Sequence, residues 1–320
     1  MDPDFQNFSA QIAAASAAVD AARRSSNFTT RLSPQHYQTL AELVYRHSRI
    51  HLGGEKQTLV ATRLAKRLRE LGLEDFGEYV RLLQSADGAR ETGILIDFIS
   101  TNYTHFFRER DHFQLLNNTI VPNWRASRTT DAFRVWSAAC SSGEEPYSIA
   151  LCLAESFAGT PEIPWTVDAS DISSRMLNRA EEGIYPADQL KLPDATWLPR
   201  YFQKGTGAYN GFCRVKDNLR NRVRFHHLNL FADRYPVAPG FQVIFCRNVM
   251  IYFDQATQAE LIARLSGYLA PGGHLLIGHS ESLLNVKHGL KSVQPSVYRK
   301  DPQASDANPN APTSTRKASP

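Results

Sequence analysis

The chain has 320 residues, 42% of them hydrophobic, which is enough for one large and one small domain with buried cores. Its 36 basic and 32 acidic residues give a net charge of +4, which argues against a protein that wraps nucleic acid over its whole surface. The four cysteines form no C-x-x-C pair, which argues against a zinc knuckle or a disulfide framework and favours a reducing compartment.

The two ends of the chain lack the apolar pattern of a folded domain. Residues 1–27 are rich in Ala and Ser and are expected to be flexible, and residues 301–320 are expected to form a disordered tail. The sequence opens without the basic and apolar regions of a signal peptide, and it holds no run of about 18 apolar residues. We therefore expect a cytoplasmic protein that does not span a membrane.

Residues 28–100 are predicted to form a small all-helical domain, because apolar residues recur there at helical spacing. Ser33-Pro34 has the N-cap and first-turn pattern of a helix start, while Gly53-Gly54 and Gly72 are predicted helix ends. A further helix is expected at about residues 92–99.

Residues 101–300 are predicted to form an α/β domain, because short apolar runs alternate there with helical stretches. Such alternation implies a mostly parallel, doubly wound Rossmann-like sheet whose ligands bind beyond the carboxyl ends of its strands. The expected strands are 133–139, 165–169, 223–227, 241–246 and 274–278.

One segment, at about residues 197–221, interrupts this alternation. Two strand-like runs flank the turn Gly205–Gly211, which predicts an inserted β-hairpin subdomain. A two-stranded hairpin is marginally stable alone, so this one needs support from the main domain or from a partner.

The loop after the first strand, Ser141–Tyr147, joins a strand to a helix but has one glycine where a dinucleotide-binding loop has three. The carboxylates of Glu144 and Glu145 would repel phosphates and would favour a positively charged amino-acid or sulfonium group. The loop is therefore compatible with an adenosine cofactor that carries no phosphate, and equally with an ordinary strand-to-helix turn.

Polar residues after the second and third strands extend this candidate site. Asp171 is placed to accept both ribose hydroxyls, or else it caps the helix that begins near Ser173. Asn229 could bond an adenine edge, or else its own backbone. After the fourth strand, Tyr252 could face the pocket or pack in the core.

The segment Gly278–Ser282 places His, Ser and Glu side by side, which raises the possibility of a hydrolase. It does not match the G-x-S-x-G nucleophile elbow, and triad residues meet in space instead of standing side by side in sequence. A loop that closes the end of the sheet is the better interpretation.

Five segments resemble, in order, the motifs of the CheR family of chemoreceptor glutamate O-methyltransferases, and the resemblance covers about residues 35–300. These segments are Thr101–Arg108, Val135–Ser148, Ala169–Ile172, Phe245–Phe253 and Gly278–Ser282. The resemblance implies methyl transfer from S-adenosylmethionine to glutamate carboxylates of transmembrane chemoreceptors. The products would be glutamate methyl esters, which serve sensory adaptation, and S-adenosylhomocysteine.

The resemblance also implies which residues bind the cofactor: Asn102, Thr104, Arg108, Glu144, Asp171, Asn229, Leu230, Arg247 and Asn248. It places Arg108 and Tyr252 nearest the methyl transfer. A glutamate with a pKa of about 4.3 is already ionised at neutral pH, so the reaction needs alignment, and neither a general base nor a metal ion. Arg108 could clamp the incoming carboxylate, and the Tyr252 hydroxyl could steady the reacting groups.

The basic side chains Arg63, Lys66 and Arg67 of the helix 56–71 are either a solvated face or a dock for an acidic receptor helix, and the resemblance favours the dock. The turn at Gly205–Gly211 could tether the C-terminal peptide of a receptor, or it could act as a flap over the pocket. We expect a monomer.

Two rival functions remain. A DNA amino-methyltransferase would carry an N/D-P-P-Y/F loop where Arg247–Met250 stands without a proline pair, so we expect no nucleic-acid partner. A module that binds the cofactor without catalysis is the second rival.

Overall fold

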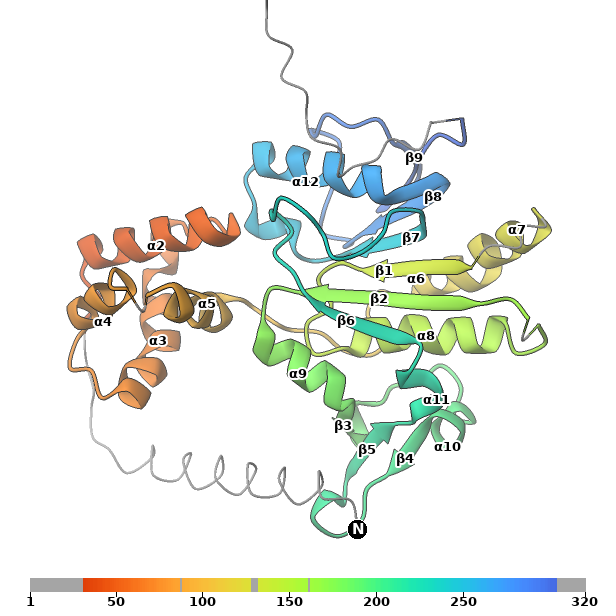
Figure 1. The fold of residues 1–320 in the computed structure, drawn as a ribbon, viewed down its shortest axis with the longest axis horizontal. Coiled ribbons are helices and arrows are strands. Elements are labelled where there is room, and N and C mark those ends of the chain that lie inside the picture. Colours follow the sequence, from red (N-terminus) through yellow and green to blue (C-terminus); the bar gives the residue numbers. More distant parts are fainter. Residues whose placement is uncertain (1–30, 87, 128–131, 161, 304–320) are drawn as a thin grey trace, which may run out of the picture.

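The computed structural model describes residues 31–86, 88–127, 132–160 and 162–303. These residues form a helical domain beside a larger α/β domain, and a small β-subdomain extends from the α/β domain (Figure 1). The predicted flexible segment and all but the first residues of the predicted tail lie outside the described residues. The helical domain and the doubly wound sheet with its insertion confirm the predicted fold class.

The helical domain packs its apolar stripes around a core of its own, which includes Leu40, Leu64 and Tyr79. The Ser33 hydroxyl accepts from the N–H of His36 at 3.1 Å and caps the first helix, as predicted. The helices are α2 (Pro34–Ser48), η1 (Gly54–Lys56), α3 (Gln57–Leu71), α4 (Phe76–Leu83) and α5 (Gly88–Ile99).

One of the two predicted helix ends was right and the other was wrong. Gly72 adopts a left-handed φ of 67° and ends α3, as predicted. The predicted end at Gly53-Gly54 was wrong because α2 already stops at Ser48. Arg49 takes a φ of 60° there, and its N–H donates to the carbonyl of Tyr45.

The α/β domain is built on a seven-stranded sheet in the order β6-β2-β1-β7-β8-β10-β9. The first five strands in this order are parallel, and β10 and β9 are antiparallel to their neighbours. The sequence did not predict these last two strands. The strands are β1 (Phe133–Ser137), β2 (Trp165–Asp171), β6 (Val223–His227), β7 (Phe241–Cys246), β8 (Leu269–Ile277), β9 (Lys291–Gln294) and β10 (Val297–Arg299).

Helices cover both faces of this sheet (Figure 1). One face, which includes Val135 and Val167, packs against α8 and α9 in one hydrophobic cluster. The other, which includes Trp136 and Ile244, packs against α12. The helices are α6 (Arg110–Leu115), the π-helical η2 (Leu116–Ile120), α7 (Val121–Ala126), α8 (Glu144–Ser156), α9 (Ser174–Glu182), η5 (Met250–Tyr252) and α12 (Gln255–Tyr268).

The inserted hairpin is part of a three-stranded antiparallel sheet with the order β3-β5-β4. The sequence predicted the two hairpin strands but not β3, which provides the support that a hairpin needs. The Tyr185 hydroxyl of β3 donates to the carbonyl of Ser142 at 2.7 Å and ties this sheet to the α/β domain. The elements are β3 (Ile184–Pro186), η3 (Ala187–Gln189), α10 (Trp197–Tyr201), β4 (Phe202–Lys204), η4 (Gly207–Tyr209), β5 (Phe212–Val215) and α11 (Asp217–Arg220).

Candidate functional site

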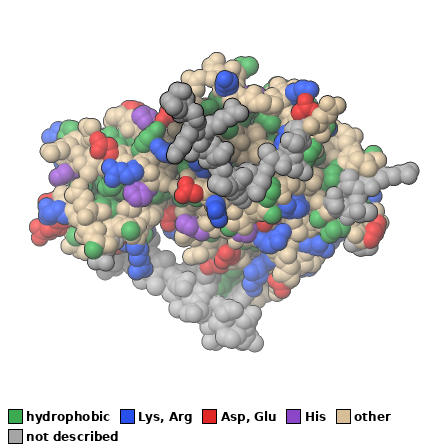
Figure 2. Space-filling view, turned by 45° about the horizontal axis from the view of Figure 1, so that its top comes forward, with side chains coloured by type: hydrophobic (Ala, Val, Ile, Leu, Met, Phe, Trp, Pro, Cys, Tyr) green, Lys and Arg blue, Asp and Glu red, His purple; other side chains and the backbone are tan. Residues whose placement is uncertain are grey.

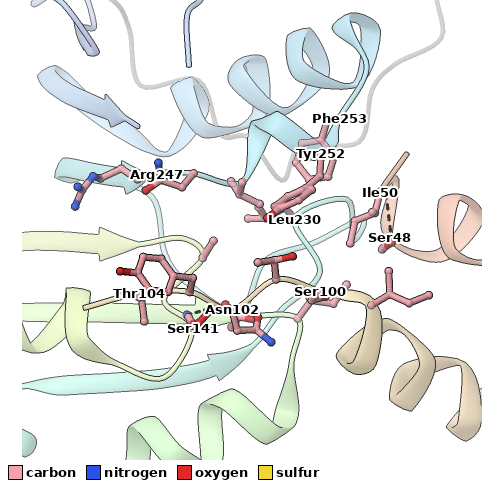
Figure 3. A pocket seen from close by; sticks show the side chains of 18 of the residues that line it. Ser48, Ile50, Ser100, Asn102, Thr104, Ser141, Leu230, Arg247, Tyr252 and Phe253 are labelled. Carbon is pink, nitrogen blue, oxygen red and sulfur yellow. Dashed lines mark hydrogen bonds between the residues drawn. The ribbon is translucent and has the colours of Figure 1, made fainter. Parts of the chain in front are cut away.

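A cavity of about 260 Å³ lies at the carboxyl ends of β1, β2, β6 and β7, where the helical domain meets the α/β domain (Figure 3). Strand order reverses between β1 and β7, which is where doubly wound sheets bind ligands. All the predicted cofactor residues line this cavity except Glu144, and Tyr252 lines it as well. The predicted residues present are Asn102, Thr104, Arg108, Asp171, Asn229, Leu230, Arg247 and Asn248.

The loop after β1 makes a sharp turn at the cavity. Gly143 has a φ of 98°, and a Cβ atom on it would lie 2.6 Å from the Tyr185 hydroxyl and 2.8 Å from the Cβ of Ala180. A larger residue would be both strained and in steric conflict. Ser141 is also left-handed, with a φ of 49°, and its N–H donates to the Asp171 carboxylate at 2.8 Å. The single glycine is therefore required by the turn itself.

Asp171 ends β2 with its carboxylate buried beside this loop. One oxygen accepts from the N–H of Ser141, and the other accepts from the N–H of Ser173 at 2.9 Å. Burial raises the pKa of Asp171, and these two donors oppose the rise. The cap of α9 is made instead by the Ser173 hydroxyl, which accepts from Met176 N–H at 3.2 Å. Each carboxylate oxygen keeps a second lone pair, so Asp171 can still accept hydroxyl groups of a ribose.

The neighbouring carboxylates Glu144 and Glu145 point to different places. Glu144 accepts from the Ser142 hydroxyl at 2.8 Å and is not among the residues that line the cavity. Glu145 lines the cavity and accepts from the Ser137 hydroxyl at 2.7 Å and from Arg247 at 3.0 Å. Burial raises the pKa of both carboxyl groups. Consecutive helical residues point about 100° apart, so Glu145 lines the cavity and Glu144 does not, and the assignment of Glu144 to the cofactor stays a prediction.

Arg247, directly after β7, is a buried cation between two carboxylates. Its Nε and Nη2 donate to Glu109 at 3.2 and 2.9 Å, its Nη1 donates to Glu145, and its Nη2 also donates to the carbonyl of Arg108. Although burial opposes it, the Arg247 charge lowers the pKa of Glu109. These bonds commit most of the guanidinium to the protein, so Arg247 mainly holds the cavity wall. The sequence did not identify Glu109 as part of the site.

The segment Gly278–Ser282 closes the end of the sheet, as expected, and also anchors the loop after β7. The buried Glu281 carboxylate accepts from the backbone N–H groups of Asn248, Met250 and Gly278 at 2.9, 2.7 and 2.6 Å. Burial raises the pKa of Glu281, and these donors oppose the rise. Asn248 itself has a φ of 57°, which this network stabilises.

The helical domain holds part of the cavity wall through backbone and side-chain contacts. The Asn229 amide donates to the carbonyl of His47 at 2.5 Å, and its oxygen accepts from the N–H of Phe231 at 2.9 Å. The second contact is the local backbone bond that the sequence allowed as an alternative role. Nearby, the N–H of His51 donates to the carbonyl of Tyr252 at 2.8 Å.

Arg108 and Tyr252 both line the cavity. The Arg108 Nη1 donates to the carbonyl of Tyr103 at 2.8 Å, and the guanidinium lies 5.7 Å from the centre of the Tyr103 ring. Among the residues that the structure describes, no carboxylate lies within ion-pair distance of Arg108. The cation therefore faces the cavity without an acidic partner.

Of the three predicted docking residues, Arg63 alone lines the cavity, where it donates to the carbonyl of Ile99 and to the Thr101 hydroxyl. Arg67 donates to the buried Glu91 carboxylate at 2.6 and 2.9 Å, and its role in docking stays a prediction. Its charge is matched inside the helical domain. Lys66 is exposed, with Glu70 at 3.8 Å. Lys56, which the sequence analysis did not single out, lines the cavity.

Comparison with known proteins shows which family this geometry belongs to. Residues 102–299 match the family described as "CheR methyltransferase, SAM binding domain", and residues 35–100 match "CheR methyltransferase, all-alpha domain". The chain belongs to the CheR methyltransferase family. The chemotaxis protein methyltransferase of Escherichia coli is 44% identical over 83% of this chain and 91% of its own length. The relative of the same name from Borreliella burgdorferi is 38% identical over 86% of this chain and 97% of its own length.

This membership shows that the chain has a domain that binds S-adenosylmethionine and catalyses methyl transfer in chemotaxis. Within the described residues, no helix is both long and apolar enough to cross a membrane. Figure 2 shows one face of the molecule, on which both basic and acidic side chains are exposed.

Proposed function

We propose that the chain methylates glutamate side chains of chemoreceptors with S-adenosylmethionine and so forms the methyl esters of sensory adaptation. The observation that carries this proposal is Arg108, a cation at the cavity that has no carboxylate partner among the described residues. A substrate glutamate would provide that partner. The curated relatives are chemotaxis protein methyltransferases, which supports a chemoreceptor as the substrate.

The donors and acceptors around the cavity fit this cofactor. When bound, S-adenosylmethionine supplies an electrophilic methyl group on a sulfonium. Asp171 accepts the ribose hydroxyls, Asn229 and Leu230 flank the adenine, and Glu145 favours the positively charged end. The wall that Arg247 holds keeps Arg108 and Glu145 in fixed positions.

The reaction in this proposal needs neither a general base nor a metal ion. A glutamate side chain has a pKa of about 4.3 in water and is therefore ionised at neutral pH. The Arg108 fork aligns the carboxylate, and the half-buried Tyr252 limits its motion. Alignment of this kind is worth up to roughly 7–11 kcal/mol in favourable systems.

The decisive assay is transfer of labelled methyl groups to receptor-containing membranes, followed by alkaline hydrolysis. We expect label that is released by base, as an ester requires, and turnover that a chelator does not abolish. Arg108→Ala should lose most turnover while keeping its unfolding temperature, and Tyr252→Phe should lose less. Arg110→Ala, which changes an exposed arginine two residues away, is the matched control. Base-stable label, or normal turnover of Arg108→Ala, would overturn the proposal.

The receptor helix in this proposal docks at the rim that the helical domain contributes. Lys56 and Arg63 line the cavity on that side, and both lie outside the ion pairs found in the described residues. Their charge suits a helix that presents several glutamates. Replacing both residues by Ala should raise KM for the receptor and make KM less sensitive to salt, and an unchanged salt dependence would count against this dock.

We propose that the β-subdomain tethers a receptor's C-terminal peptide as an added strand. Its outer strands, β3 and β4, each leave one edge unpaired in the sheet order, and a pocket of about 60 Å³ lies beside β4, lined by Lys204, Tyr209 and Arg214 among others. The flap alternative lacks support because residues 184–215 contribute nothing to the lining of the cofactor cavity. Deleting residues 205–211 should weaken binding of tail peptides and leave cofactor affinity unchanged. The opposite result would identify a lid.

We also propose a monomeric enzyme that works in the cytoplasm. All four cysteines are free and buried, which fits a reducing compartment. Light scattering during gel filtration tests the oligomeric state, and cell fractionation tests the compartment.

A further inference from the structure

A group of potential metal ligands lies behind the cavity wall, and the proposed methyl transfer does not use it. Among the residues that the structure describes, Glu109, His112 and His279 form a group that could hold a metal ion. Each offers one ligand atom, and these atoms all lie within 4.8 Å of one another. We call these three residues the Glu109 cluster. Glu109 and His112 lie before and within α6, and His279 follows β8.

His112 provides a second, independent observation. Its side chain is 1% exposed, and neither ring nitrogen has a hydrogen-bond partner. Its Nδ1 lies 3.6 Å from the Glu109 carboxylate. Its ring packs edge to face against the His279 ring, with 4.9 Å between the two ring centres. A buried polar group without a partner is destabilising, and a bound cation would satisfy a nitrogen here.

The surroundings of the Glu109 cluster favour a cation. The Asp111 carboxylate lies 3.6 Å from His279, and Glu145 lies on the far side of Arg247. Arg247 pairs with Glu109 and Glu145, and the Asp111 carboxylate adds a further negative charge beside His279. His279 is 44% exposed, so solvent reaches the cluster and this ring has room to move. Two imidazoles and a carboxylate are a ligand set that Zn²⁺ and similar transition metals prefer.

We propose that the Glu109 cluster binds one Zn²⁺-type ion and that this ion weakens cofactor binding. Glu109 is shared: its Oε2 accepts two hydrogen bonds from Arg247, and its Oε1 accepts one from Asn248 at 3.2 Å. A metal ion on this carboxylate competes with both donors. Arg247 and Asn248 line the cavity, so the ion acts on the cofactor site through Glu109 without entering the methyl-transfer step.

Metal binding can be measured apart from activity. We expect one equivalent of Co²⁺, bound to the full-length protein purified without a histidine tag, to give the visible absorption of a site with imidazole ligands, and Zn²⁺ to displace it. His279→Ala changes an exposed side chain and should weaken this binding by at least about tenfold, the scale on which loss of a ligand-shell residue acts. His36→Ala, in the helical domain, is the control and should bind as wild type. Equal Co²⁺ binding in wild type and His279→Ala would overturn the site.

The coupling to the cofactor site is tested by titrating S-adenosylhomocysteine with and without Zn²⁺. In wild type, Zn²⁺ should raise the Kd for S-adenosylhomocysteine, and in His279→Ala it should not. Glu109→Gln keeps an acceptor for Arg247 but removes the charge, and it should also abolish the Zn²⁺ effect. A Zn²⁺ effect of equal size in all three proteins would place its origin elsewhere and refute the coupling.

Discussion

Replacement of Arg247 by Ala removes the guanidinium that separates Glu109 from Glu145 and leaves both carboxylates without their shared partner. The three side chains are 1%, 12% and 13% exposed, so water replaces the lost contacts poorly. The carbonyl of Arg108 loses a donor in the same step.

The expected cost follows from this burial. Breaking one side of a buried ion pair typically costs about 3–5 kcal/mol, because a charge is left unpaired in a poorly solvated place. For a domain of this size, each kcal/mol corresponds to about 2–4 °C of unfolding temperature, so Arg247→Ala should unfold about 6–20 °C below wild type. In the variant, burial raises the pKa of both carboxyl groups. The loss of stability relative to wild type is therefore present at neutral pH, and it shrinks as the pH falls and the two carboxyl groups protonate.

Intrinsic fluorescence is the suitable assay because three of the four tryptophans lie in the α/β domain and the fourth, Trp197, lies in the β-subdomain attached to it. Arg224→Ala is the matched control. Arg224 is 57% exposed and lies 3.5 Å from Asp168, so its loss should cost less than about 1 kcal/mol. A change for Arg247→Ala as small as that of the control, or a deficit that grows in acid, would refute the buried-pair reasoning.

Three further results are expected. Asp171→Asn should weaken binding of S-adenosylhomocysteine by at least about tenfold, since hydrogen bonds to a charged acceptor contribute about 1.5–3 kcal/mol each, and unchanged calorimetric affinity would contradict the ribose contact. Gly143→Ala should lower the unfolding temperature, whereas Gly93→Ala, with open space around its Cβ and a helical backbone, should not; equal effects would remove the steric argument. Burial lowers the pKa of His274 from 6.5 to about 4. As the pH falls, the unfolded chain therefore takes up a proton on His274 before the folded chain does, and the free energy of unfolding should fall by up to about 3 kcal/mol between pH 6.5 and 4. His274→Gln should flatten that decline, and an unchanged profile would exclude His274 as its source.

The sequence was sufficient wherever a local pattern determined the structure. The helical spacing, the Ser33 cap and the parallel strands were predicted because each depends on neighbours in the chain. Strands β3, β9 and β10 were missed, since each has only three or four residues, and since β3 and β10 are stabilised by pairing with strands elsewhere in the chain, β5 and β8.

The same division holds for the candidate site. The residues at strand ends, such as Asp171 and Asn229, were predicted because parallel strands carry their carboxyl ends to one edge. Sequence reasoning could not tell which of Glu144 and Glu145 lines the cavity, nor pair Glu109 with Arg247. These choices depend on side-chain direction and on contacts more than 100 residues apart in the chain.

The contact of His47 with Asn229 couples the helical domain to the cavity, because the His47 carbonyl of α2 holds a side chain of the cavity wall. A ligand that favours this wall position must also favour docking of the helical domain, and by reciprocity a partner that steadies the helical domain must raise the affinity for the ligand. We therefore expect the enzyme to bind S-adenosylmethionine more tightly when it is docked on a receptor than when it is free. By the same coupling, enzyme without the cofactor should dissociate from receptors sooner than enzyme with the cofactor bound. Amide exchange in residues 34–48 should slow when S-adenosylhomocysteine is added, and unchanged exchange would show that the two domains respond independently.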